Sequence, residues 1–226
     1  MNHVFVTCFW NSTNDPYIHI RQKLCQEFVD RYPNVVLLQN GNLIKSNNCV
    51  NFNVKQEGFI DYIMINSFIK TIKNLKSLTL IDSDLILSSD FFKLIEKCHD
   101  KFNIDFPHFV TFRSSSELID NKVRQGPSSK IYNIMNDISP NGHTGFVLSF
   151  NKKFIDNYKF PETFIHGGFD YFLVNAVLGK CMKQFIVKFK AVPKCVYEYI
   201  ESDVLHQYHG PGELRKTNWN LYSLRF

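Results

Sequence analysis

Residues 78–87 read Leu-Thr-Leu-Ile-Asp-Ser-Asp-Leu-Ile-Leu, an apolar run interrupted by two aspartates two positions apart. The short apolar run before Asp82 predicts a buried strand. Side chains alternate along an extended segment, so Asp82 and Asp84 can point to the same side. Because ligands bind at the carboxyl ends of strands in open α/β sheets, the pair favours a binding site. The alternative is a solvated turn followed by a helix cap.

The surrounding sequence predicts alternating strands and helices. Strands are expected at residues 4–9, 35–38, 77–81, 108–112, 146–150 and 185–192. Helices are expected from Asp15 and Pro16 to Pro33, at 59–72, at 91–102 behind an Asp90 cap, near Phe154 and at 169–178. The first forty residues therefore read as β-α-β, which implies a parallel pair of strands.

The remaining segments and the absence of repeats bear on domain organisation. Residues 42–57 and 114–130 lack apolar periodicity and are expected to be irregular, the second as a mobile loop near the site. No internal repeat or linker interrupts the chain. We expect one α/β domain over residues 1–226, with a mainly parallel mixed sheet flanked by helices.

Composition and charge exclude some classes of protein. Of the 226 residues, 44% are hydrophobic and 21% charged, which suits a globular chain with a sizeable core rather than a disordered one. The net charge of +5 comes from scattered Lys and Arg, whereas nucleic-acid binders usually gather theirs on one stripe. We therefore expect no nucleic-acid partner. A diffuse positive charge does suit a diphosphate substrate.

Cysteine spacing and the N-terminal sequence indicate the cellular compartment in which the chain is expected. The six cysteines form no CxxC pair and have no zinc-finger spacing with histidine, which predicts reduced, buried thiols. We see no signal-peptide pattern, and no stretch approaches 18 uncharged apolar residues. The expectation is a cytoplasmic protein without a membrane span.

Residues near the C-terminus can complete a binding site with the two aspartates. Two neighbouring carboxylates repel each other unless one is protonated or a cation lies between them, and hard oxygen ligands favour Mg²⁺ or Mn²⁺ shared with phosphate. His206 and His209 lie near the C-terminus, where a neutral imidazole can complete such a site. Arg215 can neutralise phosphate charge. The alternative is an exposed polar tail.

Two glycine segments precede expected elements. Gly142, Thr144 and Gly145 stand before a strand, where glycine allows a tight turn and close approach of a ligand. Gly167 and Gly168 precede Asp170, which falls in the first turn of an expected helix. A plain turn and simple stabilisation of the helix by Asp170 are the alternatives.

In this order, the segments resemble the GT-A fold glycosyltransferases with a DxD motif, and are similar to small transferases of phages and large DNA viruses. The resemblance implies a Mn²⁺- or Mg²⁺-dependent hexosyl- or deoxyhexosyltransferase. It would move sugar from a nucleotide-sugar donor, UDP-linked, to an acceptor hydroxyl on a glycan or glycoprotein. Residues 1–112 would bind the nucleotide and residues 113–226 the acceptor. A viral chain would act in the host cytoplasm.

The resemblance also implies roles for single residues. Asp84 would be the firmer metal ligand and Asp82 would lie nearer the ribose, with His206 completing the site and His209 on the diphosphate, or the two histidines in reversed roles. The remaining nucleotide contacts would be Thr7, Phe9, Asn66, Ser83 and Arg215, although Phe9 can equally pack in the core.

The later segments would then serve the sugar and the acceptor. Gly142, Thr144 and Gly145 would lie near the donor sugar, and Gly167 and Gly168 near the acceptor. Asp170 would be the general base of an inverting reaction. The family usually carries an acid before this aspartate, where this chain has Phe169.

Two other functions fit the same segments. A sugar nucleotidyltransferase also uses acids and a metal on an α/β sheet, but residues 11–14 lack the glycine and basic residues that such enzymes carry after the first strand. A catalytically inactive GT-A-like domain would bind carbohydrate or protein without turnover.

Overall fold

The structure, a computed structural model, describes residues 2–10, 18–55, 60–102, 105–112, 116–119, 122–125, 147–160, 173, 176–177, 192–200 and 204–207. The strands are β1 (Asn2–Phe9), β2 (Val36–Asn40), β3 (Cys49–Phe52), β4 (Leu75–Ile81), β5 (Leu85–Ile86), β6 (His108–Phe112), β7 (Ser116–Ile119), β8 (Lys122–Gln125), β9 (Val147–Asn151), β10 (Val196–Ile200) and β11 (Leu205–Gln207). The helices are α1 (Ile18–Arg31), α2 (Asp61–Ile69), α3 (Phe91–Lys101) and α5 (Lys152–Asn157).

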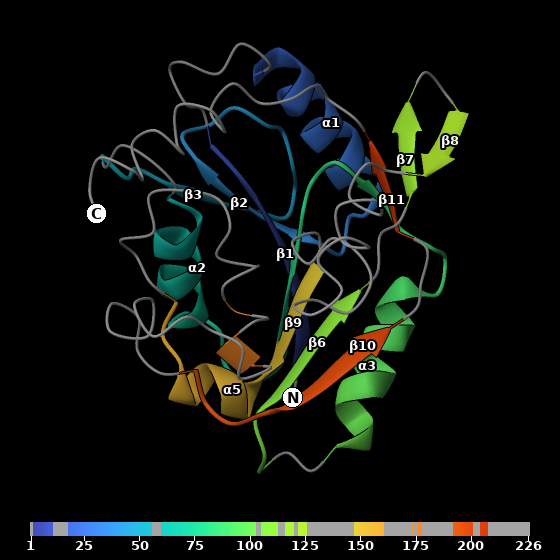
Figure 1. Ribbon diagram of the computed structural model, residues 1–226. Coiled ribbons are helices and arrows are strands. Elements are labelled where there is room, and N and C mark those ends of the chain that lie inside the picture. Colours follow the sequence, from blue (N-terminus) through green and yellow to red (C-terminus); the bar gives the residue numbers. More distant parts are fainter. Residues whose placement is uncertain are drawn as a thin grey trace, which may run out of the picture.

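The main sheet has seven strands in the order β10-β6-β9-β4-β1-β2-β3. Strand β1 pairs in parallel with β2 and β4, and β3 extends the parallel set beyond β2. Only β9 runs against its neighbours, β4 and β6. The expected fold class is confirmed: an α/β protein with a mixed, mainly parallel sheet flanked by helices (Figure 1).

Alternating side chains divide the core between the two faces of this sheet. Phe5 and Phe9 of β1 pack with residues of α1 and α3. Val6, between them, packs on the opposite side with residues of α2 and α5. Both clusters contain phenylalanines that are almost completely buried. Because both faces are covered, the carboxyl ends of the parallel strands are where polar groups can gather.

A second, four-stranded sheet has the order β5-β11-β7-β8. Strand β5 follows β4 after only three residues, and β11 pairs with it in the antiparallel sense. On its other side β11 runs parallel to β7. This small sheet therefore brings the late part of the chain back to the acidic segment that follows β4 (Figure 1).

Several local expectations are wrong. Residues 42–57 contain β3, and residues 114–130 contain the β7–β8 pair in place of an irregular loop. Strands β5, β10 and β11 were not expected either. Asp90 stands at the N-cap of α3, but its side chain makes no capping hydrogen bond. Strands β5 and β11 are only two and three residues long, too short for alternation to reveal.

Other expectations fall partly or wholly on residues that the structure leaves undescribed. Asp15 and Pro16 lie there. Of the expected helix at 169–178, three described residues, Leu173, Ala176 and Val177, are helical. Of the expected strand at 185–192, only Val192 is described, and it is not in a strand. No helix within the described ranges has the length and apolar character needed to cross a bilayer.

Candidate metal and nucleotide site

The acidic segment lies at the carboxyl end of β4, in the middle of the main sheet. Asp82 is exposed, whereas Ser83 and Asp84 are partly buried in the turn before β5. The hydroxyl of Tyr32, at the end of α1, accepts a hydrogen bond from Leu87 N–H (2.8 Å) and donates to its carbonyl (3.3 Å). Ser83 also lies within hydrogen-bonding reach of the buried Cys25 thiol. Helix α1 thus holds both sides of the turn.

Strand β11 places His206 beside Asp84. His206 pairs with Leu85 in the ladder, and Gln207 N–H donates to the Asp84 carbonyl at 2.8 Å. The imidazole Nε2 of His206 lies 3.2 Å from Asp84 Oδ2, with the side chains 13% and 19% exposed. Two residues that are 122 positions apart in sequence are therefore in direct contact, with a small part of each reachable by solvent.

This pair has the donor chemistry of a divalent metal site. Two ligand atoms at about 2.1 Å from a Mg²⁺ ion, and at right angles to each other, lie about 3 Å apart. The 3.2 Å separation of the His206 and Asp84 atoms fits that geometry. Within the described ranges, no group of three or more His, Cys, Asp or Glu residues could hold a metal. The described residues therefore supply two candidate ligand atoms in contact, those of Asp84 and His206, and Asp82 is exposed.

The three expected nucleotide contacts on β1 and α2 are buried. Thr7 and Phe9 are each 1% exposed, and Phe9 packs in the core on the α1 side of the sheet. Thr7 Oγ1 has no hydrogen-bond partner among the described residues. Asn66 is also buried, and its Nδ2 donates to the Phe160 carbonyl at 2.8 Å. Packing and structural hydrogen bonding account for Phe9 and Asn66; a nucleotide role for all three residues stays a prediction.

A second acidic group near the site, Asp61, was missed at the sequence level. It is the first residue of α2, and its Oδ1 is enclosed. Burial raises the pKa of Asp61 to about 7, while the charge of Arg21 and a hydrogen bond from Trp10 act to lower it. Burial raises the pKa of the Cys8 thiol, and the charges of Asp61 and Asp82 add to that rise.

These electrostatic couplings place Asp61 near the same sheet edge as the acidic turn. Both Asp61 and Asp82 lie near enough to Cys8, at the end of β1, to affect its ionisation. Arg21 of α1 offers the one cationic group that acts on both Asp61 and Cys25 among the described residues. The only feature of the sequence that singles out Asp61 is its place in the first turn of an expected helix. Acidic residues are common there because they stabilise the helix, so this feature does not indicate a binding site.

The other predicted site residues lie outside the described ranges. They are Gly142, Thr144, Gly145, Gly167, Gly168, Asp170, His209 and Arg215. Their roles, including the general base assigned to Asp170, stay predictions.

Comparison with known proteins bears on the fold alone. No protein-family model matches the chain, and no curated protein matches it in sequence. A solved structure of TarS residues 1–349 from S. aureus is similar at 13% identity, with a TM-score of 0.47, over 92% of this chain and 60% of that one. The bifunctional IspDF of Campylobacter jejuni is similar at 13% identity (TM-score 0.45), over 90% of this chain and 50% of that one.

A third similar structure is a glycosyltransferase involved in glycosylation of the major capsid of PBCV-1. The identity is 14% and the TM-score 0.42, over 96% of this chain and 99% of that one. The chain spans 60% and 50% of the two longer proteins. Similarity at this level says nothing about which reaction the chain carries out.

Proposed function

We propose that the chain is a metal-dependent glycosyltransferase of the GT-A type. It would move a sugar from a nucleotide donor, UDP-linked, to a hydroxyl of a glycan or glycoprotein, in the cytoplasm of its cell or of a host. The observation that supports this most is the contact of Asp84 with His206 beyond the carboxyl end of β4. A carboxylate and an imidazole at that edge suit a Mn²⁺ or Mg²⁺ ion that the donor diphosphate completes.

The roles of the described residues follow from their positions. Asp84 and His206 would hold the ion, and exposed Asp82 would accept hydrogen bonds from the ribose. When bound, the metal would offset the negative charge that builds on the leaving diphosphate. Cys25 and Tyr32 would keep the acidic turn in place, because they contact Ser83 and Leu87 on either side of Asp84. Asp170 would take the proton from the acceptor hydroxyl, which favours inversion at the anomeric carbon.

Calorimetric titration tests the proposed metal site. UDP should bind with Mn²⁺ and bind at least about tenfold more weakly with chelator, since an ion held by Asp84 and His206 would offset the charge of the diphosphate. Asp84→Asn and His206→Gln should remove this metal dependence. The matched control, Asp156→Asn, changes an exposed aspartate on α5 and should keep it. Binding that is equally tight with chelator would contradict the metal role of Asp84 and His206.

Product analysis separates the competing functions. A transferase should slowly hydrolyse one UDP-sugar to UDP and free sugar, and Asp84→Asn should abolish that release. A nucleotidyltransferase would instead use added pyrophosphate to convert the nucleotide sugar into a nucleoside triphosphate and a sugar 1-phosphate. An inactive domain would bind donor and release nothing. For the mechanism, NMR of a transfer product should show the anomeric configuration opposite to that of the donor, and retention would rule out the role given to Asp170.

A further inference from the structure

The loop between β2 and β3 is locked by glutamine side chains. The Gln39 carboxamide accepts from the N–H groups of Leu43 (3.0 Å) and Ile44 (2.9 Å) and donates to the Ile44 carbonyl (3.0 Å). The Gln26 carboxamide accepts from Lys45 N–H (3.0 Å) and donates to its carbonyl (2.8 Å). Gln22 donates to the Leu43 carbonyl at 2.9 Å.

Every backbone N–H and C=O of residues 43–45 is thereby hydrogen-bonded. Ile44 adds an anchor, because its side chain is buried in the core beneath α1. A surface connection held at so many points has already lost its conformational freedom. Side chains carried by such a loop bind a ligand at lower entropic cost than those of a flexible loop.

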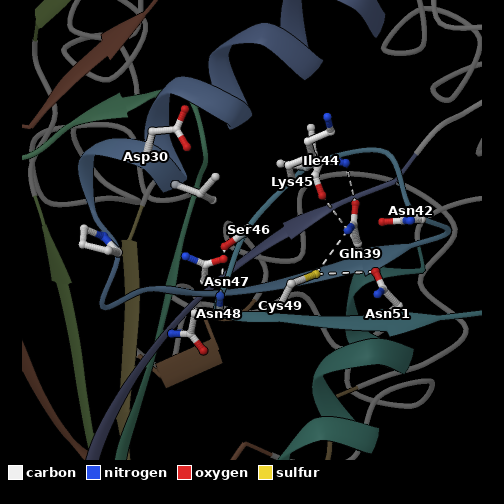
Figure 2. Close-up of a pocket in the computed structure, with 12 residues that line it drawn as sticks. Asp30, Gln39, Asn42, Ile44, Lys45, Ser46, Asn47, Asn48, Cys49 and Asn51 are labelled. Carbon is white, nitrogen blue, oxygen red and sulfur yellow. Dashed lines mark hydrogen bonds between the residues drawn. The ribbon is translucent and has the colours of Figure 1, made fainter.

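The locked loop lines an open hollow of about 530 Å³ between the end of α1 and the β2–β3 edge of the sheet. We call it the asparagine hollow, because Asn42, Asn47, Asn48 and Asn51 all line it. Figure 2 shows these four carboxamides distributed around the same space. None of the residues that line the hollow belongs to the candidate metal and nucleotide site.

The lining chemistry restricts the ligand. Lys45 and Asp30 contribute one charge of each sign, so the lining has no net charge to attract a phosphate. None of the twelve lining residues is aromatic, which leaves no ring for a nucleobase to stack on. What remains is a set of carboxamides, each with two donors and one acceptor oxygen. Vicinal hydroxyl groups, which both donate and accept, match this set.

We propose that the asparagine hollow binds a neutral saccharide unit. Pro33 provides the exposed aliphatic part of the lining, against which the C–H face of a sugar ring can lie. Binding here requires neither a nucleotide nor a metal, so the proposal stands apart from the transferase function. If the chain is a transferase, the hollow gives a glycan acceptor a second point of attachment.

NMR of the ¹⁵N-labelled full chain tests the proposal with three neutral probes: cellotetraose, fully N-acetylated chitotetraose and mannotetraose. One of them, at up to about 10 mM, should shift the backbone amides of residues 42–51 and the side-chain amides of Asn47 and Asn51, with a Kd on the order of 1 mM. The double variant Asn47→Ala/Asn51→Ala should weaken binding at least fivefold. The control Asn53→Ala, an exposed neighbour that does not line the hollow, should leave it unchanged.

The same spectra show whether each variant is folded, so loss of binding is not confused with loss of structure. Asp84→Asn should keep the saccharide-induced shifts, which separates this result from failure of the transferase proposal. Absence of shifts with all three probes would overturn the saccharide site. So would shifts that persist in the double variant, or that map away from the residues that line the hollow.

Discussion

At the scale of single residues, Asp61 shows how a group near the site lowers stability. Burial raises its pKa to about 7 in the folded protein, against an ordinary value of 3.8. Between these values the folded chain holds a proton that the unfolded chain has lost. The protonated Asp61 carboxyl therefore favours the folded state at about pH 4. This contribution to the free energy of unfolding falls as the pH rises and is lost above about pH 7.

Asp61→Asn should therefore stabilise the protein at pH 8, by about 1 kcal/mol or more, because the amide cannot ionise and can still accept from Trp10. The melting temperature should rise by roughly 2–4 °C at pH 8, and the difference should shrink towards pH 4. Thermal unfolding followed by circular dichroism at the two pH values measures this. Asp90→Asn, at an exposed aspartate without a capping bond, is the control and should show no such gain. Equal melting temperatures at pH 8 would refute the argument.

At the scale of elements, Asn151 joins three of them. It ends β9 and is the N-cap of α5, where its Oδ1 accepts from Phe154 N–H at 3.0 Å. The same oxygen accepts from His108 N–H at the start of β6 (2.9 Å), and Nδ2 donates to the Phe106 carbonyl (2.7 Å). One buried carboxamide therefore fixes how the helix and two strands meet.

Asn151→Ala should cost about 2–3 kcal/mol of unfolding free energy, since it removes a helix cap and leaves buried backbone groups without partners. Urea unfolding measures the change. Asn157→Ala is the matched control: that side chain makes one exposed bond to the Lys153 carbonyl, and its loss should stay within about 0.5 kcal/mol. A similar loss of unfolding free energy in both variants would show that the hydrogen bonds of Asn151 do not stabilise the fold more than an exposed one does.

Elements also show what could be predicted from sequence. Strands β1 and β4 were found because their apolar runs are long enough to be recognised, and Asp84 was placed at the carboxyl end of β4 for the same reason. The two-residue β5 and three-residue β11 have no such pattern. His206 could be proposed as a ligand from its residue type, but its contact with Asp84 depends on pairing across 122 positions, which local periodicity does not encode. Asp61 was missed because burial is a tertiary property.

At the scale of the whole molecule, a row of buried polar groups crosses the main sheet. Thr79 Oγ1 lies 2.7 Å from Ser149 Oγ, which lies 2.7 Å from His99 Nε2. The Nδ1 atoms of His99 and His108 are 3.1 Å apart, and His108 Nε2 lies 3.6 Å from Glu198 Oε2. We infer that the Glu198 carboxylate favours an N–H at His108 Nε2, so that His99 donates to His108 and accepts from Ser149. Strands β4, β9 and β6 and helix α3 thus share one network of neutral side chains, and the Glu198 carboxylate of β10 lies 3.6 Å from its end.

Acid should weaken the whole fold through this network. Burial lowers the pKa of His99 to about 3, with the charges of His108 and His3 adding to the effect, and burial lowers the pKa of His108 to about 4. Because the unfolded histidines take up protons near pH 6.5, stability should fall between about pH 6.5 and pH 4, by up to about 1.4 kcal/mol per pH unit for each histidine. His99→Gln should lower stability at pH 7 yet flatten this dependence by about one proton. Urea unfolding at pH 7, 6, 5 and 4 measures it, with exposed His19→Gln as the control. An unchanged slope in His99→Gln would mean that the acid sensitivity arises elsewhere, since a glutamine at this position cannot titrate.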